Sequence, residues 1–164
     1  MNTETLLQLF GSLPPNVAIF LIAMLPVAEL RGAIPVALTV YQLPVWLAYF
    51  LALIGNIIPG AVLLWLLGPT AGYLSENSQL AKRFFDWLFT RTRHKFAGKY
   101  ERWGALALVL FVAVPLPVTG VWTGAVAAFL FGIPKRRALA LLSLGAAIAG
   151  GIVTMATIGI ISIF

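Results

Sequence analysis

The sequence contains no cysteine and few charged residues of either sign. The absence of cysteine from its 164 residues excludes disulfide bonds, thiolate metal sites and cysteine nucleophiles. Only 10% of the residues are charged, against about 25% in ordinary soluble domains, and 61% are hydrophobic, against about 45–50%. A soluble fold cannot bury so large an apolar fraction. The composition therefore predicts an integral membrane protein.

Several kinds of chemistry also lack their residues. His94 is the single histidine, and no paired aspartates accompany it, so a metal enzyme or a membrane protease is not expected. No glycine loop has the spacing and the lysine of a phosphate-binding loop. We therefore predict that the protein is not an enzyme and uses no cofactor. Any pumping then has to draw on a proton or sodium gradient.

The hydrophobic residues fall into four blocks: 17–41, 44–67, 105–133 and 138–164. The second and fourth carry no charge and are long enough to cross a hydrocarbon core of roughly 30 Å, since a helix rises about 1.5 Å per residue. The first and third are interrupted near their centres by prolines and glycines, which break or kink helices. Each of these two blocks is predicted to form two short helices joined by an irregular tip, at 26–35 and at 115–120.

The basic residues predict the topology. They cluster between Lys82 and Arg102 and again at 135–137, on either side of the third block. Because positive residues favour the cytoplasmic side, this block is predicted to be re-entrant, which places both clusters in the cytoplasm. Both termini then lie outside the cell (inner or plasma) membrane of a multi-pass protein, and the first hairpin enters from outside.

The basic segment itself has a pattern. In residues 80–89 apolar side chains alternate with the charged side chains of Lys82, Arg83 and Asp86, in the manner of a basic amphipathic helix on the membrane surface. This helix is interpreted either as a topology anchor or as an element that recruits membrane lipids, which are the expected partners. The net charge of +6 is confined to segments that flank apolar stretches, so binding of nucleic acid is not expected.

A weak internal repeat joins these features. A shift of 90 residues aligns Pro44 with Pro134 and Gly55 with Gly145. With hairpins that enter from opposite sides, the two copies become inverted repeats whose tips converge near the midplane. The predicted fold is thus an all-α membrane protein with one domain, 1–164, made of repeat 1 (14–68), a basic amphipathic cytoplasmic loop (69–104) and repeat 2 (105–164).

The first tip carries the candidate chemistry. Glu29 and Arg31 are the only charged residues inside the apolar blocks, where a charge costs roughly 2.5–3.5 kcal/mol at a helix centre. One interpretation is a polar cavity, including Gly32 and Pro35, in which Arg31 binds an anionic group and Glu29 takes or gives a proton. The other is a structural ion pair that locks the hairpin. The functional interpretation is favoured, because uncharged groups would lock a hairpin at lower cost.

The second tip offers polar groups without charge. Its free carbonyls, hydroxyls and indole N–H, together with a half-helix N-terminus that favours anions, come from Pro115, Pro117, Thr119, Gly120, Trp122 and Thr123. The alternative for each threonine is a hydroxyl bonded back to its own helix. Asn56 and Pro59 are interpreted either as an opening of a spanning helix near the site or as a packing kink, and the kink is favoured.

Glycines in the last block have a packing role in this interpretation. Gly145, Gly150 and Gly151 are predicted to let helices approach closely, either within the protomer or across a homodimer.

These motifs together resemble a known family. The run AELRGAIP at 28–35, followed by PLPVTGVWTG at 115–124, resembles the bacterial and archaeal membrane proteins called putative small multidrug export proteins. That family is in turn distantly similar to DedA, or VTT-domain, proteins, which have opposed re-entrant hairpins and include members implicated in moving undecaprenyl phosphate and other lipids. The resemblance implies a transporter.

Three functions remain open at this point. The first is a small secondary transporter that moves an anionic lipid, such as one like undecaprenyl phosphate, or a small anion through a midplane site. The second is a proton-coupled small multidrug exporter acting through Glu29, for which the neighbouring Arg31 is an obstacle because it repels cationic drugs. The third is a membrane organiser that transports nothing.

Overall fold

Residues 13–80, 82–83, 100–116 and 119–163 are described by a computed structural model. Within these residues the regular structure is entirely helical, which confirms the prediction of an all-α protein. The helices are α2 (Pro15–Met24), α3 (Glu29–Thr39), α4 (Val45–Asn77), α6 (Tyr100–Ala113), α7 (Val121–Leu130) and α8 (Lys135–Ile163). Pro117, His94 and most of the predicted surface helix at 80–89 lie outside the described residues.

Both interrupted blocks form helical hairpins. Prolines start the first one, with Pro15 in the first turn of α2, where a missing N–H costs no hydrogen bond. The break between α2 and α3 spans only residues 25–28, whereas the break between α6 and α7 covers 114–120. Each block therefore consists of two short helices, as the sequence predicts.

The first break is shorter than the predicted tip at 26–35. Helix α3 begins at Glu29 and continues through Gly32 and Pro35 to Thr39. A proline inside a helix removes one backbone donor, here the one that would reach the carbonyl of Arg31, but the hydrogen bonds on either side can still form. Pro35 therefore belongs to a helix and not to an irregular segment.

The two remaining helices are long. Helices α4 and α8 have 33 and 29 residues and are apolar enough to cross a membrane. At about 1.5 Å per residue, α4 is about 50 Å long, which exceeds a hydrocarbon core of about 30 Å. It runs ten residues past Leu67, so residues 69–77 of the predicted cytoplasmic loop are helical. Helix α8 likewise starts at Lys135, within the second basic cluster.

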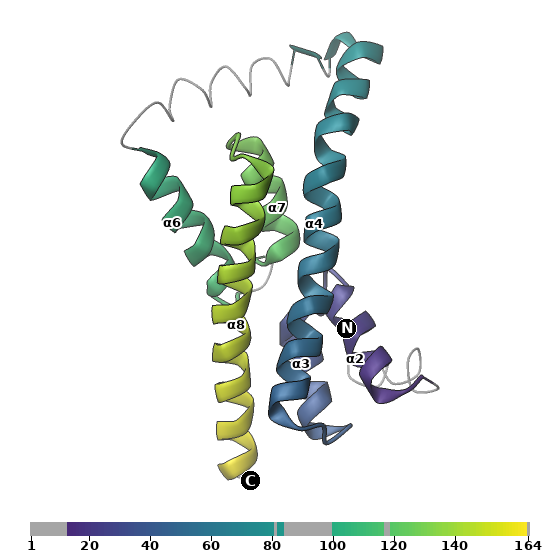
Figure 1. Cartoon of the computed structure of the whole chain (residues 1–164), viewed down its shortest axis with the longest axis vertical. Coiled ribbons are helices and arrows are strands. Elements are labelled where there is room, and N and C mark those ends of the chain that lie inside the picture. The colour runs from purple at the N-terminus through teal and green to yellow at the C-terminus, as the bar shows by residue number, and fades with distance from the viewer. Residues whose placement is uncertain (1–12, 81, 84–99, 117–118, 164) are drawn as a thin grey trace.

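The hairpins lie at opposite ends of this pair of long helices. In Figure 1, α4 and α8 run in opposite directions, α2 and α3 occupy the lower half, and α6 and α7 occupy the upper half. Helix α2 packs on α4 and helix α6 packs on α8, while α3 and α7 each contact both long helices. The two hairpin tips meet near mid-height (Figure 1).

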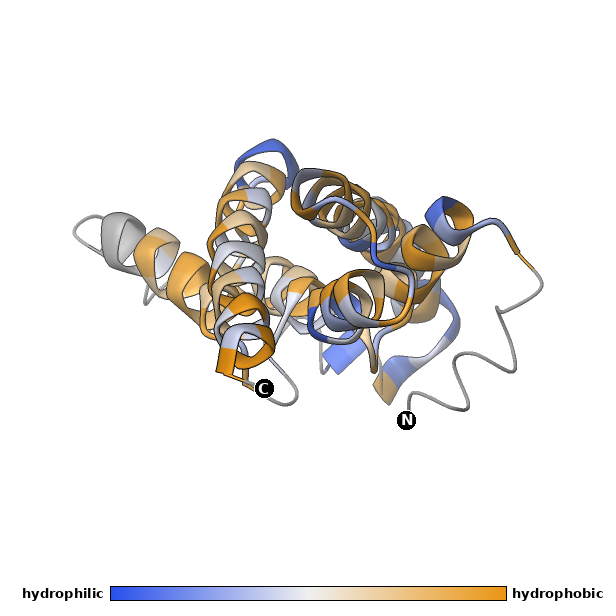
Figure 2. Cartoon of the chain, turned by 90° about the horizontal axis from the view of Figure 1, so that it is seen from below, coloured by the Kyte–Doolittle hydropathy of each residue, from blue (hydrophilic) through white to orange (hydrophobic). Residues whose placement is uncertain are grey.

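Small residues are frequent in the interior, and many large apolar residues lie on the outside. Buried positions include many alanines, such as Ala23, Ala52 and Ala146, all 0% exposed, whereas Trp65 and Met155 are 58% and 71% exposed. Hydrophobic residues occur along most of the length of the helices in Figure 2. This distribution is the one expected when lipid is the solvent, because helices in membranes associate through small residues.

Glycine packing on the long helices gives a first testable prediction. A Cβ on Gly145 would lie 2.9 Å from the backbone oxygen of Val109 in α6, whereas a Cβ on Gly151 would meet no atom within 4 Å. We expect Gly145→Ala to lower the free energy of unfolding by about 1–3 kcal/mol, because α6 has to move away. Gly151→Ala, on the same helix, should leave it unchanged or raise it slightly. Denaturant titration in detergent micelles measures both, and equal effects would contradict the close α6–α8 approach.

Candidate functional site

The first turn of α3 presents both charged side chains of the hairpin. Glu29 opens the helix with φ 46°, in the left-handed region that L-residues other than asparagine and aspartate rarely adopt. This backbone conformation costs about 1–2 kcal/mol, which contacts with the surrounding residues have to offset. This backbone conformation lets two side chains only two residues apart approach each other, and Arg31 Nη2 lies 3.6 Å from Glu29 Oε2.

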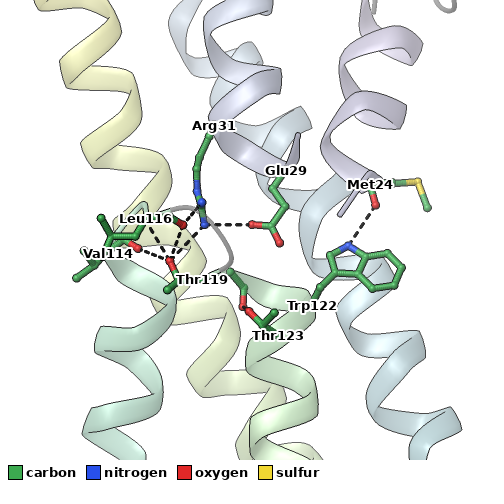
Figure 3. Close-up of polar contacts among 9 residues, drawn as sticks. Met24, Glu29, Arg31, Val114, Leu116, Thr119, Trp122 and Thr123 are labelled. Atoms are coloured by element: carbon green, nitrogen blue, oxygen red, sulfur yellow. Dashed lines mark hydrogen bonds and ion pairs between the residues drawn. The ribbon is translucent and has the colours of Figure 1, made fainter. Parts of the chain in front are cut away.

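Arg31 reaches across to the second hairpin. Its Nη1 donates a hydrogen bond to the carbonyl oxygen of Leu116, and its Nη2 donates to Thr119 Oγ1 at 3.4 Å (Figure 3). Thr119 Oγ1 also lies 2.8 Å from the carbonyl oxygens of Val114 and Leu116, so it closes the turn of its own tip. The hydroxyl of Thr119 therefore contacts both its own break and Arg31 of the other hairpin.

Glu29 occupies the N-terminus of α7. The backbone N–H groups of Val121 and Trp122 interact favourably with its carboxylate. A helix N-terminus carries partial positive charge and free N–H groups, so it favours an anion. The predicted anion-binding half-helix is thus already occupied by a carboxylate of the same chain. Gly120 makes this possible, because a Cβ there would coincide with the Glu29 carboxylate.

A third contact joins the two tips, and here the donor belongs to the second hairpin and the acceptor to the first. Trp122 Nε1 donates to the carbonyl oxygen of Met24 at 3.3 Å, at the end of α2 (Figure 3). Thr123 Oγ1 donates to the carbonyl of Gly120 at 3.3 Å, which is the local bond that the alternative interpretation predicts. Each tip therefore supplies side chains that bond to the other tip's backbone.

A cavity opens beside these contacts. It has a volume of about 380 Å³ and is lined by Pro26, Val27, Glu29, Arg31, Thr119, Trp122 and Thr123. We call it the tip cavity. Its two charged groups differ in accessibility, since the Arg31 side chain is 27% exposed and the Glu29 side chain 9%. Arg31 is therefore the more accessible of the two charged side chains.

Most of the predicted site residues gather here. Five of them, Glu29, Arg31, Thr119, Trp122 and Thr123, line the tip cavity, and Gly120 lies against Glu29. The other described ones, Gly32, Pro35 and Pro115, do not line it: the first two are inside α3, and Pro115 lies in the second break. Pro117 is outside the described residues.

One polar residue near the site, Asn56, is not among the predicted site residues, because a packing kink was the favoured interpretation. Asn56, in the middle of α4, is 1% exposed and lies beside Glu29, Arg31 and Gly120 around a second, very small cavity. Its position in an otherwise charge-free apolar block was the available signal, because a lone amide is unusual there. The carbonyl groups of Met24 and Leu116 carry no such signal, since any residue supplies a carbonyl.

Comparison with known proteins adds one finding. The family model described as "Putative small multi-drug export protein" matches residues 29–152, a stretch that begins with α3 at Glu29, includes the second break and ends within α8. Neither the curated proteins nor the solved structures give a match. The predicted resemblance to this family is confirmed, and the distant similarity to DedA proteins is not borne out.

Proposed function

Because the chain belongs to the family of putative small multi-drug export proteins, we propose that it is a secondary transporter whose substrate binds in the tip cavity. The family name denotes an exporter and not a class of enzyme. The observation that carries the proposal is the Arg31 bridge between the hairpins, from the start of α3 to Leu116 and Thr119 of the second tip. A substrate that binds Arg31 competes with Leu116 and Thr119 for the guanidinium and so weakens one of the contacts between the tips, of which the bond from Trp122 to the carbonyl of Met24 is another.

The arrangement of the hairpins supports alternating access. In each half of the chain the first short helix packs on the long helix of its own half and the second contacts both long helices. Gly55 of α4 lies close to α2, and Gly145 of α8 lies close to α6. These two glycines are the ones that the shift of 90 residues aligns. Inverted repeats produce such equivalent contacts, and transporters use them to open a central site to either side.

The orientation in the membrane follows from this proposal. Opposed hairpins with tips at mid-height fit two re-entrant segments, one entering from each face, with α4 and α8 as the spanning helices (Figure 1). Lys135, Arg136 and the basic segment from Lys82 then lie on the cytoplasmic side, as the positive-inside rule favours. Both termini lie on the opposite face.

The substrate class follows from which charge is accessible. The tip cavity exposes the Arg31 guanidinium, while the Glu29 carboxylate is turned toward the N-terminus of α7. A guanidinium pairs well with phosphate or carboxylate, which can accept two parallel hydrogen bonds. We infer that the substrate carries an anionic group, either on a lipid headgroup or on a small soluble anion, and that Trp122, Pro26 and Val27 contact its apolar part.

A cationic drug is the second candidate. The family name and the indole of Trp122 in the tip cavity favour it, because aromatic rings bind cations. Such a substrate would have to replace Arg31 as the partner of Glu29.

The proposal is tested by measuring the flux of fluorescent probes across the membrane of proteoliposomes. The probes are a fluorescent phosphatidylglycerol, carboxyfluorescein as a soluble anion, and ethidium as a cation. We expect the protein to move one or both anionic probes and not ethidium, and the two anionic arms separate a lipid from a small anion. Arg31→Gln should reduce the flux at least about tenfold, since a bidentate charge-assisted contact is lost.

Arg136→Gln is the matched control. It removes the same charge from the exposed start of α8 and should leave the flux unchanged. Movement of ethidium alone would indicate that the substrate is a cationic drug. Absence of any flux, with unchanged behaviour of the Arg31 variant, would leave the protein as an organiser of the membrane.

A further inference from the structure

The small cavity beside Asn56 has no role in the substrate site described so far. It has a volume of about 10 Å³ and is lined by Glu29, Arg31, Asn56, Gly120 and apolar residues that include Val112 and Ala146. A volume of this size is about what one water molecule needs. We call it the Asn56 cavity.

Two acceptors, Glu29 and Asn56 Oδ1, line this cavity, and the guanidinium of Arg31 that also lines it bonds to Leu116 and Thr119 and not to Asn56. Asn56 Oδ1 is buried and has no hydrogen-bond partner among the described residues. Buried side-chain oxygens are almost always hydrogen-bonded, so an unpaired one calls for a donor in the cavity. The Glu29 carboxylate, when ionised, is acceptor-only as well. Two groups can meet this need: a water that donates one O–H to each oxygen, or a proton on Glu29 that is donated to Asn56.

We propose that the Asn56 cavity is the proton-coupling site of the transporter. With ionised Glu29, one bound water donates to both Glu29 and Asn56 Oδ1. When Glu29 is protonated, its O–H points to Asn56 Oδ1, directly or through that water. The role of this site in transport rests on the function proposed above.

The proton step frees the substrate-binding charge. A hydronium ion entering from the tip cavity gives its proton to a Glu29 oxygen, so that one O–H bond forms on the carboxyl and one water molecule is released. The carboxylate charge disappears, and Arg31 loses its counter-ion at 3.6 Å. The guanidinium then pairs with the anionic group of the substrate. Proton and anion therefore bind together, in a ratio of one to one.

The surroundings favour a proton over a sodium ion. Arg31 is the only other charged group that the described residues place around Glu29, and it lines the same cavity. Helix α4 contributes Asn56 to the lining of this cavity, α6 contributes Val112, and α8 contributes the apolar residues Ala146 and Ala149. The backbone N–H groups of Val121 and Trp122 interact with Glu29 itself. A sodium ion would sit beside a guanidinium with only two side-chain groups to supply oxygen ligands. A proton needs just one acceptor.

Infrared difference spectroscopy of the reconstituted protein tests the site without requiring transport. The difference spectrum of the parent, low pH minus high pH, should contain the C=O band of a protonated carboxyl. The spectrum of Glu29→Gln should lack this band. Asn56→Leu should shift this band to higher wavenumber, because the hydrogen bond to Oδ1 is lost. Asn56→Thr, which retains an acceptor, should keep it nearer the parental position. If Asn56→Leu does not fold, Asn56→Ala removes the same oxygen without added bulk.

Thr154→Val is the matched control for a buried polar group. The hydroxyl of Thr154 is bonded at 2.7 Å to the carbonyl of Gly150 in its own helix, so its loss should leave the Glu29 band unchanged. In proteoliposomes, Asn56→Leu should lower flux driven by a pH gradient about tenfold, a typical size for coupling between two sites.

Two results would overturn the proposal. One is a Glu29 band that does not respond to the leucine or alanine change at Asn56. The other is flux that a sodium gradient drives in the absence of a pH gradient. A responsive band in a protein that moves none of the probes would refute the transport function instead, and leave the proton site in place.

Discussion

Arg31→Gln is expected to lower the free energy of unfolding by about 3 kcal/mol, because it leaves the buried Glu29 carboxylate without its counter-ion. Glu29 is 7% exposed, and only the N–H groups of Val121 and Trp122 would still compensate its charge. Adding Glu29→Gln should recover most of this loss, since the double variant buries no charge at all. Denaturant titration of the two single variants and the double variant in detergent micelles gives the coupling energy.

The same variants separate stability from activity. The double variant folds but carries no charge in the tip cavity, so it should transport none of the anionic probes. Strictly additive effects of the two single changes would show that Glu29 and Arg31 do not interact in the membrane. Recovery of transport together with stability in the double variant would assign the pair a purely structural role.

Gly120→Ala is expected to reduce transport by about 10–100-fold while the fold is retained. The added Cβ would occupy the position of the Glu29 carboxylate, which is the end of a flexible side chain and moves without displacing the backbone. The carboxylate then loses the charge-assisted hydrogen bonds at the start of α7, worth about 1.5–3 kcal/mol. Flux of the anionic probe that the parent carries measures the effect.

Gly72→Ala controls for the loss of a glycine. It lies on α4 where an added Cβ meets no atom within 4 Å, and it should transport like the parent. Parental transport by Gly120→Ala would mean that the place of Glu29 at the N-terminus of α7 has no part in the cycle. Loss of folded protein would instead point to a backbone contact at Gly120.

Local features of the chain were readable from the sequence. The membrane class follows from composition, and the two breaks follow from prolines and glycines, whose effect on the backbone is confined to their neighbours. Glu29 and Arg31 stood out because a charge in an apolar block is costly wherever it lies. The extent of each break was harder to predict. Helix α3 runs through Pro35 because one missing backbone donor does not end a helix that is packed on both long helices.

The contacts within the site could be identified only from the folded chain. Arg31 bonds to a carbonyl 85 residues away, and Trp122 bonds to one 98 residues away, and nothing in the local sequence marks Leu116 or Met24 as acceptors. The same holds for Gly120, whose lack of a side chain matters only because Glu29 arrives there. Asn56 was visible as a polar residue in an apolar helix, but its unpaired oxygen appears only when α3, α4, α6 and α8 are packed together.

The sequence by itself determined that this is a helical membrane protein with two broken apolar segments, one of which carries a pair of opposite charges. It could do so because the effects of composition and of prolines and glycines are local. The tertiary structure alone decided how the charges are used. It turns Glu29 toward the start of α7 and leaves Arg31 more exposed in the tip cavity. Accessibility depends on which distant segments cover a group, and segments far apart in the chain meet only in the fold.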